Sequence, residues 1–120
     1  MLQWRNYIAS KYDGPKLSGP LLVICHFHIP SAKSVQKHKK TQLDGLPHWK
    51  TPDGDNLEKF LFDCCTRTLW VDDSQVSWIV RSKTYTKEEE GWTELYVTEI
   101  PTGPIDNEAL MKTIWQNLKK

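Results

Sequence analysis

The stretch from Leu21 to His28 constrains the fold most, because it is an almost unbroken apolar run. It reads Leu-Leu-Val-Ile-Cys-His-Phe-His, which is rich in residues that favour β-strands. Gly19-Pro20 marks a turn before the run, and Pro30 closes it. The run therefore predicts a strand that other elements cover on both faces for most of its length.

Periodicity predicts the elements around this strand. Apolar and polar residues alternate over residues 75–86 and again over residues 92–100, so we expect two strands that form an antiparallel hairpin. On the first of these strands, alternation places three apolar residues on one face: Val76, Trp78 and Val80. On the second, two residues point inward: Leu95 and Val97.

Helical spacing of apolar residues predicts helices over residues 1–12, 56–68 and 106–119. Asp106 is the expected cap of the last helix, and its apolar face consists of Leu110, Met111, Ile114, Trp115 and Leu118. Residues 31–52 form either a long basic loop or a loop with a short helix around residues 32–40. The order of elements predicts an α+β domain, in which helices pack on a small mixed sheet of about three strands.

The helix over residues 56–68 has the clearest pattern. Five apolar residues recur at the spacing of one helix face: Leu57, Phe60, Leu61, Cys64 and Cys65. Asp55 is the expected N-cap, and Glu58 completes an acidic version of a capping box.

Two acidic clusters bracket this helix: Asp53 with Asp55 before it, and Asp72 with Asp73 after it. Carboxylates this close repel one another, and a hard cation such as Mg²⁺ would turn that repulsion into coordination by oxygen. Lys59 lies one turn after Asp55 on the same side of the helix. The alternative is two ordinary polar turns. An EF-hand is excluded, because its glycine and later ligands are not at the required offsets.

A basic segment leads into the first acidic cluster. Its lysines are Lys33, Lys37, Lys39, Lys40 and Lys50, against the single acid Asp44. Because the net charge is only +1, the charge is distributed unevenly along the chain. This segment either binds phosphate, with His48 as a further contact, or forms a solvated surface.

Other side chains allow two interpretations each. His26 and His28 share one face of their strand, as a zinc pair would, but a structural role is favoured because no third ligand has suitable spacing. Trp49 and Trp92 are candidates for stacking on bases or on a partner. Two tryptophans on apolar stripes are expected in the core: Trp78 and Trp115.

Length and composition limit the classes of protein to which this chain can belong. The 120 residues fit one domain. No apolar run approaches the roughly 20 residues of a membrane span, and the N-terminus does not look like a signal peptide, so we expect a cytoplasmic protein without a membrane partner. Three cysteines without a Cys-x-x-Cys pair argue against both a disulfide framework and a zinc knuckle.

The segment from Pro52 to Val76 resembles the RusA family of Holliday junction resolvases. Residues 52–59 read Pro-Asp-Gly-Asp-Asn-Leu-Glu-Lys, and residues 70–76 read Trp-Val-Asp-Asp-Ser-Gln-Val. The family pattern is approximately Pro-Asp-x-Asp-Asn-Leu-x-Lys, a helix, and then Asp-Asp-x-Gln followed by Val or Ile. The resemblance covers residues 20–100. It implies a single RusA-like endonuclease domain over residues 1–120, with residues 52–76 as its core motif and residues 106–119 as an extra C-terminal helix.

The resemblance also implies roles for individual residues. The chain would be a Mg²⁺-dependent, homodimeric endonuclease that resolves four-way DNA junctions in recombination and repair, with Mn²⁺ as a substitute metal. Asp53, Asp55 and Asp73 would bind the metal, supported by Asp72, and Lys59 would be the catalytic lysine beside the scissile phosphate. The DNA backbone would be held by Lys33, Lys37, Lys39, Lys40, His48 and Lys50.

Two features depart from the family pattern. Gly54 stands where many members have leucine. Family members usually begin with a further strand, so we expect either a truncated start or a fold that lacks this edge strand. Two alternative functions therefore stay open, a catalytically inactive DNA-binding relic and a metal- or protein-binding module without a nucleic-acid role. A helix of about 13 residues is about 20 Å long. We accordingly expect a two-fold dimer in which Asp53 and Asp55 of one subunit meet Asp73 of the other.

Overall fold

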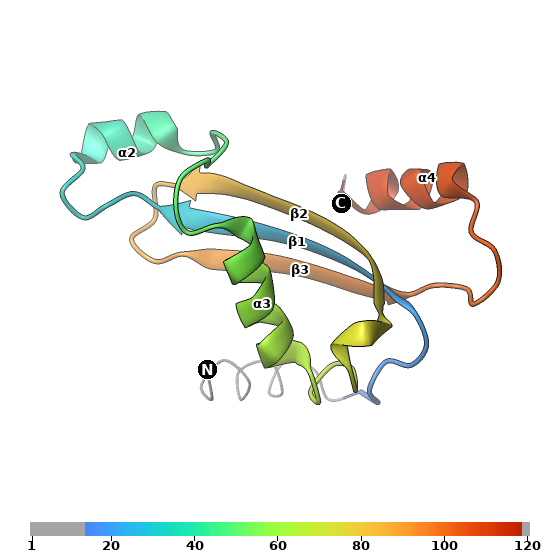
Figure 1. Ribbon diagram of the computed structural model, residues 1–120. Coiled ribbons are helices and arrows are strands. Elements are labelled where there is room, and N and C mark those ends of the chain that lie inside the picture. The colour runs from blue at the N-terminus through green and yellow to red at the C-terminus, as the bar shows by residue number, and fades with distance from the viewer. Residues whose placement is uncertain (1–13, 119–120) are drawn as a thin grey trace.

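The computed structural model describes residues 14–118, which form a three-stranded sheet with helices on both faces (Figure 1). The predicted α+β class with a small mixed sheet is confirmed. The helix predicted over residues 1–12 lies outside the described residues. None of the described helices combines the length and apolar character that crossing a bilayer requires.

The apolar run forms β1 (Leu21–Pro30), the central strand of the sheet. It pairs in parallel with β2 (Val76–Thr86) and antiparallel with β3 (Trp92–Glu99), so the order is β2-β1-β3. The predicted hairpin between β2 and β3 is therefore wrong. A strand that is apolar on both faces is buried best at the centre of the sheet, and β1 takes that place between them.

The segment between β2 and β3 crosses the end of β1 instead of forming a tight turn (Figure 1). Gly91 marks the crossing, because a Cβ atom at this position would lie only 3.0 Å from the carbonyl oxygen of His28. A side chain there would push the crossing segment away from β1.

Alternate residues of β1 face two separate cores. Leu21 and Val23 pack with Cys65, Leu69 and Trp70, beneath α3 (Gly54–Cys65). Leu95 and Val97 of β3 also pack here, as predicted.

On the opposite face, Leu22 and Ile24 pack with Leu110 and Ile114 of α4 (Asn107–Leu118). Figure 1 shows α3 crossing in front of the sheet. The predicted coverage of β1 on both faces is thus confirmed.

A register shift separates residues that were predicted to share a face. The pairing of β1 with β2 skips one residue of β2, so Leu21 pairs with Val76 but Leu22 pairs with Trp78. Because a one-residue slip reverses the side of the sheet, Val76 packs in the α3 core while Trp78 and Val80 pack in the α4 core.

Helices α2 (Lys37–Leu43) and α4 agree with expectation only in part. The short α2 does interrupt the basic segment, later than residues 32–40. Asp106 caps α4 as predicted, since its Oδ1 accepts from the backbone nitrogen of Glu108 at 3.0 Å. Two residues assigned to the apolar face of α4 are instead exposed: Met111 by 60% and Trp115 by 61%.

Helix α3 begins at Gly54, two residues before the predicted start at residue 56. Asp53 occupies the N-cap position without a side-chain cap, and Asp55 lies inside the first turn, so the predicted capping box is wrong. Phe60 is 42% exposed, whereas Phe62 packs edge-on against Trp70, with ring centroids 5.6 Å apart. The predicted apolar face is therefore wrong at Phe60, whereas Leu61 packs against the core and Cys64 and Cys65 are buried as predicted.

Candidate active site along helix α3

One pocket of about 320 Å³ runs along α3, and it contains residues from both acidic clusters. Its lining comprises Asp55, Glu58, Lys59, Phe62, Asp63 and Asp73. Asp55 and Lys59 come from the first two turns of the helix, and Asp73 comes from the short 3-10 helix that follows it. Residues 18 positions apart thus meet at one surface, together with the lysine that the motif contains.

Two basic residues of β2 hold the start of α3 from beneath. Arg81 donates through Nη1 to Asp55 Oδ1 at 2.9 Å and to Glu58 Oε2 at 2.7 Å. Two residues along the strand, on the same face, Lys83 Nζ donates to the carbonyl oxygens of Lys50 at 2.7 Å and Pro52 at 2.8 Å. The loop and the first turn of α3 are therefore fixed to the sheet by charge-assisted hydrogen bonds.

Asp73 is positioned by the turn after α3. Its Oδ1 accepts hydrogen bonds from Thr66 Oγ1 and, at 3.2 Å, from Nε1 of the fully buried Trp70. Thr66 itself ends the helix, and its hydroxyl also donates to the carbonyl oxygen of Phe62. These contacts direct the Asp73 carboxylate back toward the last turn of α3, which is why it reaches the pocket.

Asp72 has a different role from its neighbour. Its Oδ1 accepts from the backbone nitrogen of Ser74 at 2.8 Å, and these hydrogen bonds from Ser74 lower the pKa of the Asp72 carboxyl. Gln75 completes the capping box, since its Oε1 accepts from the backbone nitrogen of Asp72. Gln75 Nε2 also donates to the carbonyl oxygens of Leu17 and Gly19, so this turn is tied to the chain before β1.

Asp53 does not line the pocket, although it directly precedes α3. Among the described residues, no three His, Cys, Asp or Glu side chains converge closely enough to hold a metal. Two of the three predicted carboxylates, Asp55 and Asp73, therefore share the pocket, and the third stands apart at the helix start.

The family comparison decides what class of protein this pocket belongs to. A family model described as "Endodeoxyribonuclease RusA" matches residues 2–97, which is most of the chain. The chain belongs to the RusA endodeoxyribonuclease family. The comparison with curated proteins finds no match. The RusA match ends at residue 97, within β3, so it includes β1, β2, most of β3 and the whole acidic motif but not α4.

For a RusA-family chain, the donor set of the pocket fits Mg²⁺ in its chemistry. Mg²⁺ takes oxygen ligands, and in sites that act on phosphates it uses one or two carboxylates together with waters and substrate oxygens. Asp55 and Asp73 supply such carboxylates to the lining of the pocket. The Asp55 side chain is 80% exposed despite its contact with Arg81, so it is accessible to an ion from solvent.

The basic segment lies around α2 at one end of the sheet (Figure 1). Lys33, Lys37, Lys39 and Lys50 are exposed, and Lys40 is half-buried. His48 is only 7% exposed, with its ring tilted against Tyr85 at a centroid distance of 4.7 Å. Burial, followed by the charges of Lys83 and Lys50, lowers the pKa of His48. The neighbouring Trp49 is 84% exposed.

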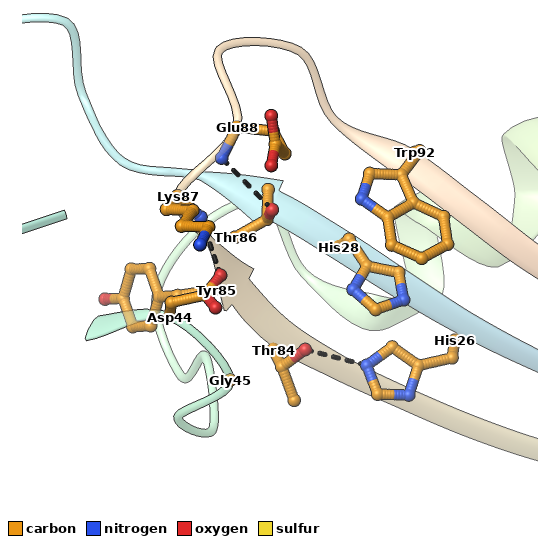
Figure 2. A pocket seen from close by; sticks show the side chains of 10 residues that line it. All are labelled: His26, His28, Asp44, Gly45, Thr84, Tyr85, Thr86, Lys87, Glu88 and Trp92. Atoms are coloured by element: carbon orange, nitrogen blue, oxygen red, sulfur yellow. Dashed lines mark hydrogen bonds between the residues drawn. The ribbon is translucent and has the colours of Figure 1, made fainter. Parts of the chain in front are cut away.

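A second pocket, of about 380 Å³, includes His26 and His28 of β1, which continue the two-residue spacing of Leu22 and Ile24 and so share the face opposite α3. Figure 2 shows the side chains that line this pocket. His28 stacks on Trp92 and on His26, with centroid distances of 3.6 Å and 4.3 Å. His26 Nε2 pairs with Thr84 Oγ1 at 2.7 Å, and His28 Nε2 with Glu94 Oε1 at 2.6 Å. These partners are structural ones, in agreement with the favoured interpretation of the two histidines.

The cysteines are core residues, as expected. All three are buried, and burial raises the pKa of Cys25 to about 11 and that of Cys65 to about 12. Thiols with such pKa values are poor nucleophiles at neutral pH.

Sequence reasoning did not predict the roles of five residues around the candidate site. Glu58 and Asp63 line the pocket, and Arg81 and Lys83 lie beneath α3. Gln75 connects the second acidic turn to the chain before β1. A usable signal was present for the basic pair. Arg81 and Lys83 stand two residues apart in a strand, so they share a face, and that face is the one opposite Trp78 and Val80.

Proposed function

We propose that this RusA-family protein is a Mg²⁺-dependent endonuclease that cuts four-way DNA junctions, with Mn²⁺ as a substitute metal. The observation that carries the proposal is the meeting of Asp55, Lys59 and Asp73 at one pocket in a chain of this family. The other predicted role, DNA backbone binding by the basic segment, agrees with the exposure of four of its five lysines.

In this proposal the residues at the site have different roles in phosphodiester hydrolysis. Asp55 and Asp73 would hold the ion, and Asp53, which lies at the helix start outside the pocket, would complete the set of carboxylates. When bound, the ion would activate a water whose oxygen forms a new bond to phosphorus, and would offset the charge that develops as the bond to the leaving oxygen breaks. Lys59 places its ammonium group beside the phosphate and adds to that stabilisation. Asp72 keeps Asp73 in position through the capped turn.

A homodimer is part of the proposal, because a four-way junction presents two equivalent cleavage positions to a two-fold symmetric enzyme. Two arrangements are consistent with the pocket. Asp55 and Asp73 serve one site within each subunit, or the second subunit contributes its Asp73 to the site of the first. Mixing an Asp55→Asn chain with an Asp73→Asn chain distinguishes them, since only a shared site regains an intact acidic set in the heterodimer.

The deciding experiment is incubation of the protein with a labelled four-way junction in the presence of Mg²⁺ or Mn²⁺. We expect paired nicks near the branch point and no cleavage without the metal. Asp55→Asn and Asp73→Asn should abolish cleavage while junction binding in a gel-shift assay stays close to that of the parent protein. Salt-sensitive junction binding without cleavage would favour an inactive relic. Absence of DNA binding at low salt would favour an interaction module.

A further inference from the structure

Arg81 is the residue of the candidate site that the family motif does not contain. It lies on β2, outside both acidic clusters, yet its Nη1 atom contacts two α3 carboxylates at once. Asp55 and Glu58 are three residues apart on the helix, so they are neighbours on its surface, and without a cation between them they would repel each other. Arg81 supplies that cation.

The packing around Arg81 is specific. A Cβ atom on Gly54 would lie 2.6 Å from Arg81 Nε and 2.9 Å from Arg81 Cζ, so the guanidinium group rests directly against the backbone of the first turn of α3. Only glycine leaves this space. The side chain of Arg81 is 35% exposed, and its route from the sheet to the carboxylates passes beneath the helix start.

We propose that Arg81 is a positioning residue that holds Asp55 and Glu58 together in the metal-free protein and competes with the divalent cation for Asp55. This inference rests on the proposed function, since it assumes that Asp55 binds the ion. Arg81 balances part of the negative charge of the pocket before the ion arrives. Metal binding then has to proceed against a fixed positive charge, which lowers the affinity for the ion.

Two variants separate charge from contact. Arg81→Gln removes the charge while keeping a polar side chain, and Arg81→Lys keeps the charge while losing the planar group that reaches both carboxylates. Removing one positive charge close to a divalent ion, in surroundings close to water, should tighten binding by about tenfold. We therefore expect Mn²⁺ to bind Arg81→Gln about tenfold more tightly than the parent protein, and Arg81→Lys to bind it with nearly the parent affinity.

The measurement is Mn²⁺ titration of the full chain without DNA, followed by electron paramagnetic resonance of the free ion. A second readout is thermal unfolding with and without Mn²⁺. Arg81→Gln should unfold at a lower temperature than the parent without metal, because Asp55 and Glu58 then repel each other, and added Mn²⁺ should raise its unfolding temperature more than that of the parent. Lys112→Gln is the matched control, since it removes one positive charge from an exposed position of α4, on the face of the sheet opposite α3.

Unchanged or weaker Mn²⁺ binding in Arg81→Gln would overturn the inference, as would equal tightening in Arg81→Lys. Failure of the proposed function looks different. In that case the parent protein and Asp55→Asn would bind Mn²⁺ equally, and the inference would fall with the function. If Asp55→Asn loses Mn²⁺ while Arg81→Gln behaves as the parent, only the role of Arg81 is wrong.

Discussion

The ammonium group of Lys83 lies 2.8 Å from the carbonyl oxygen of Pro52, the residue just before the first acidic cluster. It also lies 2.7 Å from the carbonyl oxygen of Lys50. A side chain of the sheet thereby fixes the backbone that delivers Asp53 to the start of α3. The candidate site is therefore built on the sheet as much as on the helix.

Lys83→Met should lower the free energy of unfolding by about 1–2 kcal/mol, because two carbonyl oxygens lose a charged donor. It should also reduce junction cleavage, since the loop before Asp53 is no longer held. Urea unfolding followed by tryptophan fluorescence measures the first effect. Lys112→Met, an exposed position on α4, is the control and should leave stability unchanged. Equal stability of Lys83→Met and the parent would contradict this account.

Gly54→Ala should displace the Arg81 side chain, because the new methyl group would overlap Arg81 Nε. The loss is partly offset by the better helix propensity of alanine, so the net change in stability should stay within about 1 kcal/mol. The informative measurement is a double-mutant cycle with Arg81→Gln. The two effects should be strongly non-additive, since each change breaks the same contacts. Gly103→Ala, which has open space around the new methyl group, should show additivity with Arg81→Gln.

Asp72 and Asp73 should respond differently to the same substitution. Asp73→Asn should abolish cleavage, because its carboxylate lines the pocket. Asp72→Asn should retain measurable cleavage at nearly unchanged stability, because the asparagine side-chain oxygen can still accept the hydrogen bond from the backbone nitrogen of Ser74 that caps the turn. Measuring single-turnover cleavage and urea unfolding for both variants tests the division. A complete loss of cleavage in Asp72→Asn at unchanged stability would place Asp72 among the metal ligands.

His48 should make stability depend on pH between its unfolded and folded pKa values. Burial lowers the pKa of His48 in the folded state, so below about pH 6.5 the unfolded chain binds a proton more readily than the folded one. Stability should be fully present above that pH and decline as the pH falls toward the folded pKa. His48→Phe should flatten this decline in a series of urea unfolding curves. Because His26 also has a lowered pKa, His26→Phe serves as a second comparison and should remove a separate part of the slope.

The lysines of α2 should contribute to DNA binding through contacts with phosphates, which make the binding constant depend on salt concentration. Each phosphate contact that is lost should reduce the slope of log K against log salt by about 0.9 on duplex arms. Lys37→Gln combined with Lys39→Gln should therefore reduce the slope by about 2 if both contact the backbone. Lys112→Gln on α4 should leave the slope unchanged. Fluorescence anisotropy of a labelled junction between 50 and 200 mM salt is suitable, since affinity changes steeply in that range.

Local pattern predicted most of the elements of this chain. The apolar run predicted a strand buried on both sides, and Asp106 predicted the start of α4, because both depend on neighbouring residues alone. The hairpin failed for the opposite reason. The pattern of residues 75–100 does not predict that β1 inserts between the two strands, because that arrangement depends on how the whole sheet buries its apolar faces.

In the candidate site, too, the local motif predicted some residues and the others depend on the fold. The motif predicted Asp55, Lys59 and Asp73 as site residues, and the pocket contains all three. Arg81 was not found, because its partnership with Asp55 spans 26 residues and needs the packing of α3 on the sheet. The cap predicted at Asp55 was wrong because α3 begins at Gly54, which places Asp55 inside the first turn, where its side chain contacts Arg81.

The central position of β1 has a consequence for how the protein acquires its structure. Strands β2 and β3 are close in sequence but never pair, so neither can form a stable local unit before residues 21–30 arrive between them. The parallel pairing of Leu22 with Trp78 closes a loop that contains α2 and α3. Closing that loop is slow, because its entropy is lost before the contacts form. The acidic pocket should therefore assemble late and cooperatively with the sheet, and a peptide of residues 76–99 should show no β-structure by circular dichroism.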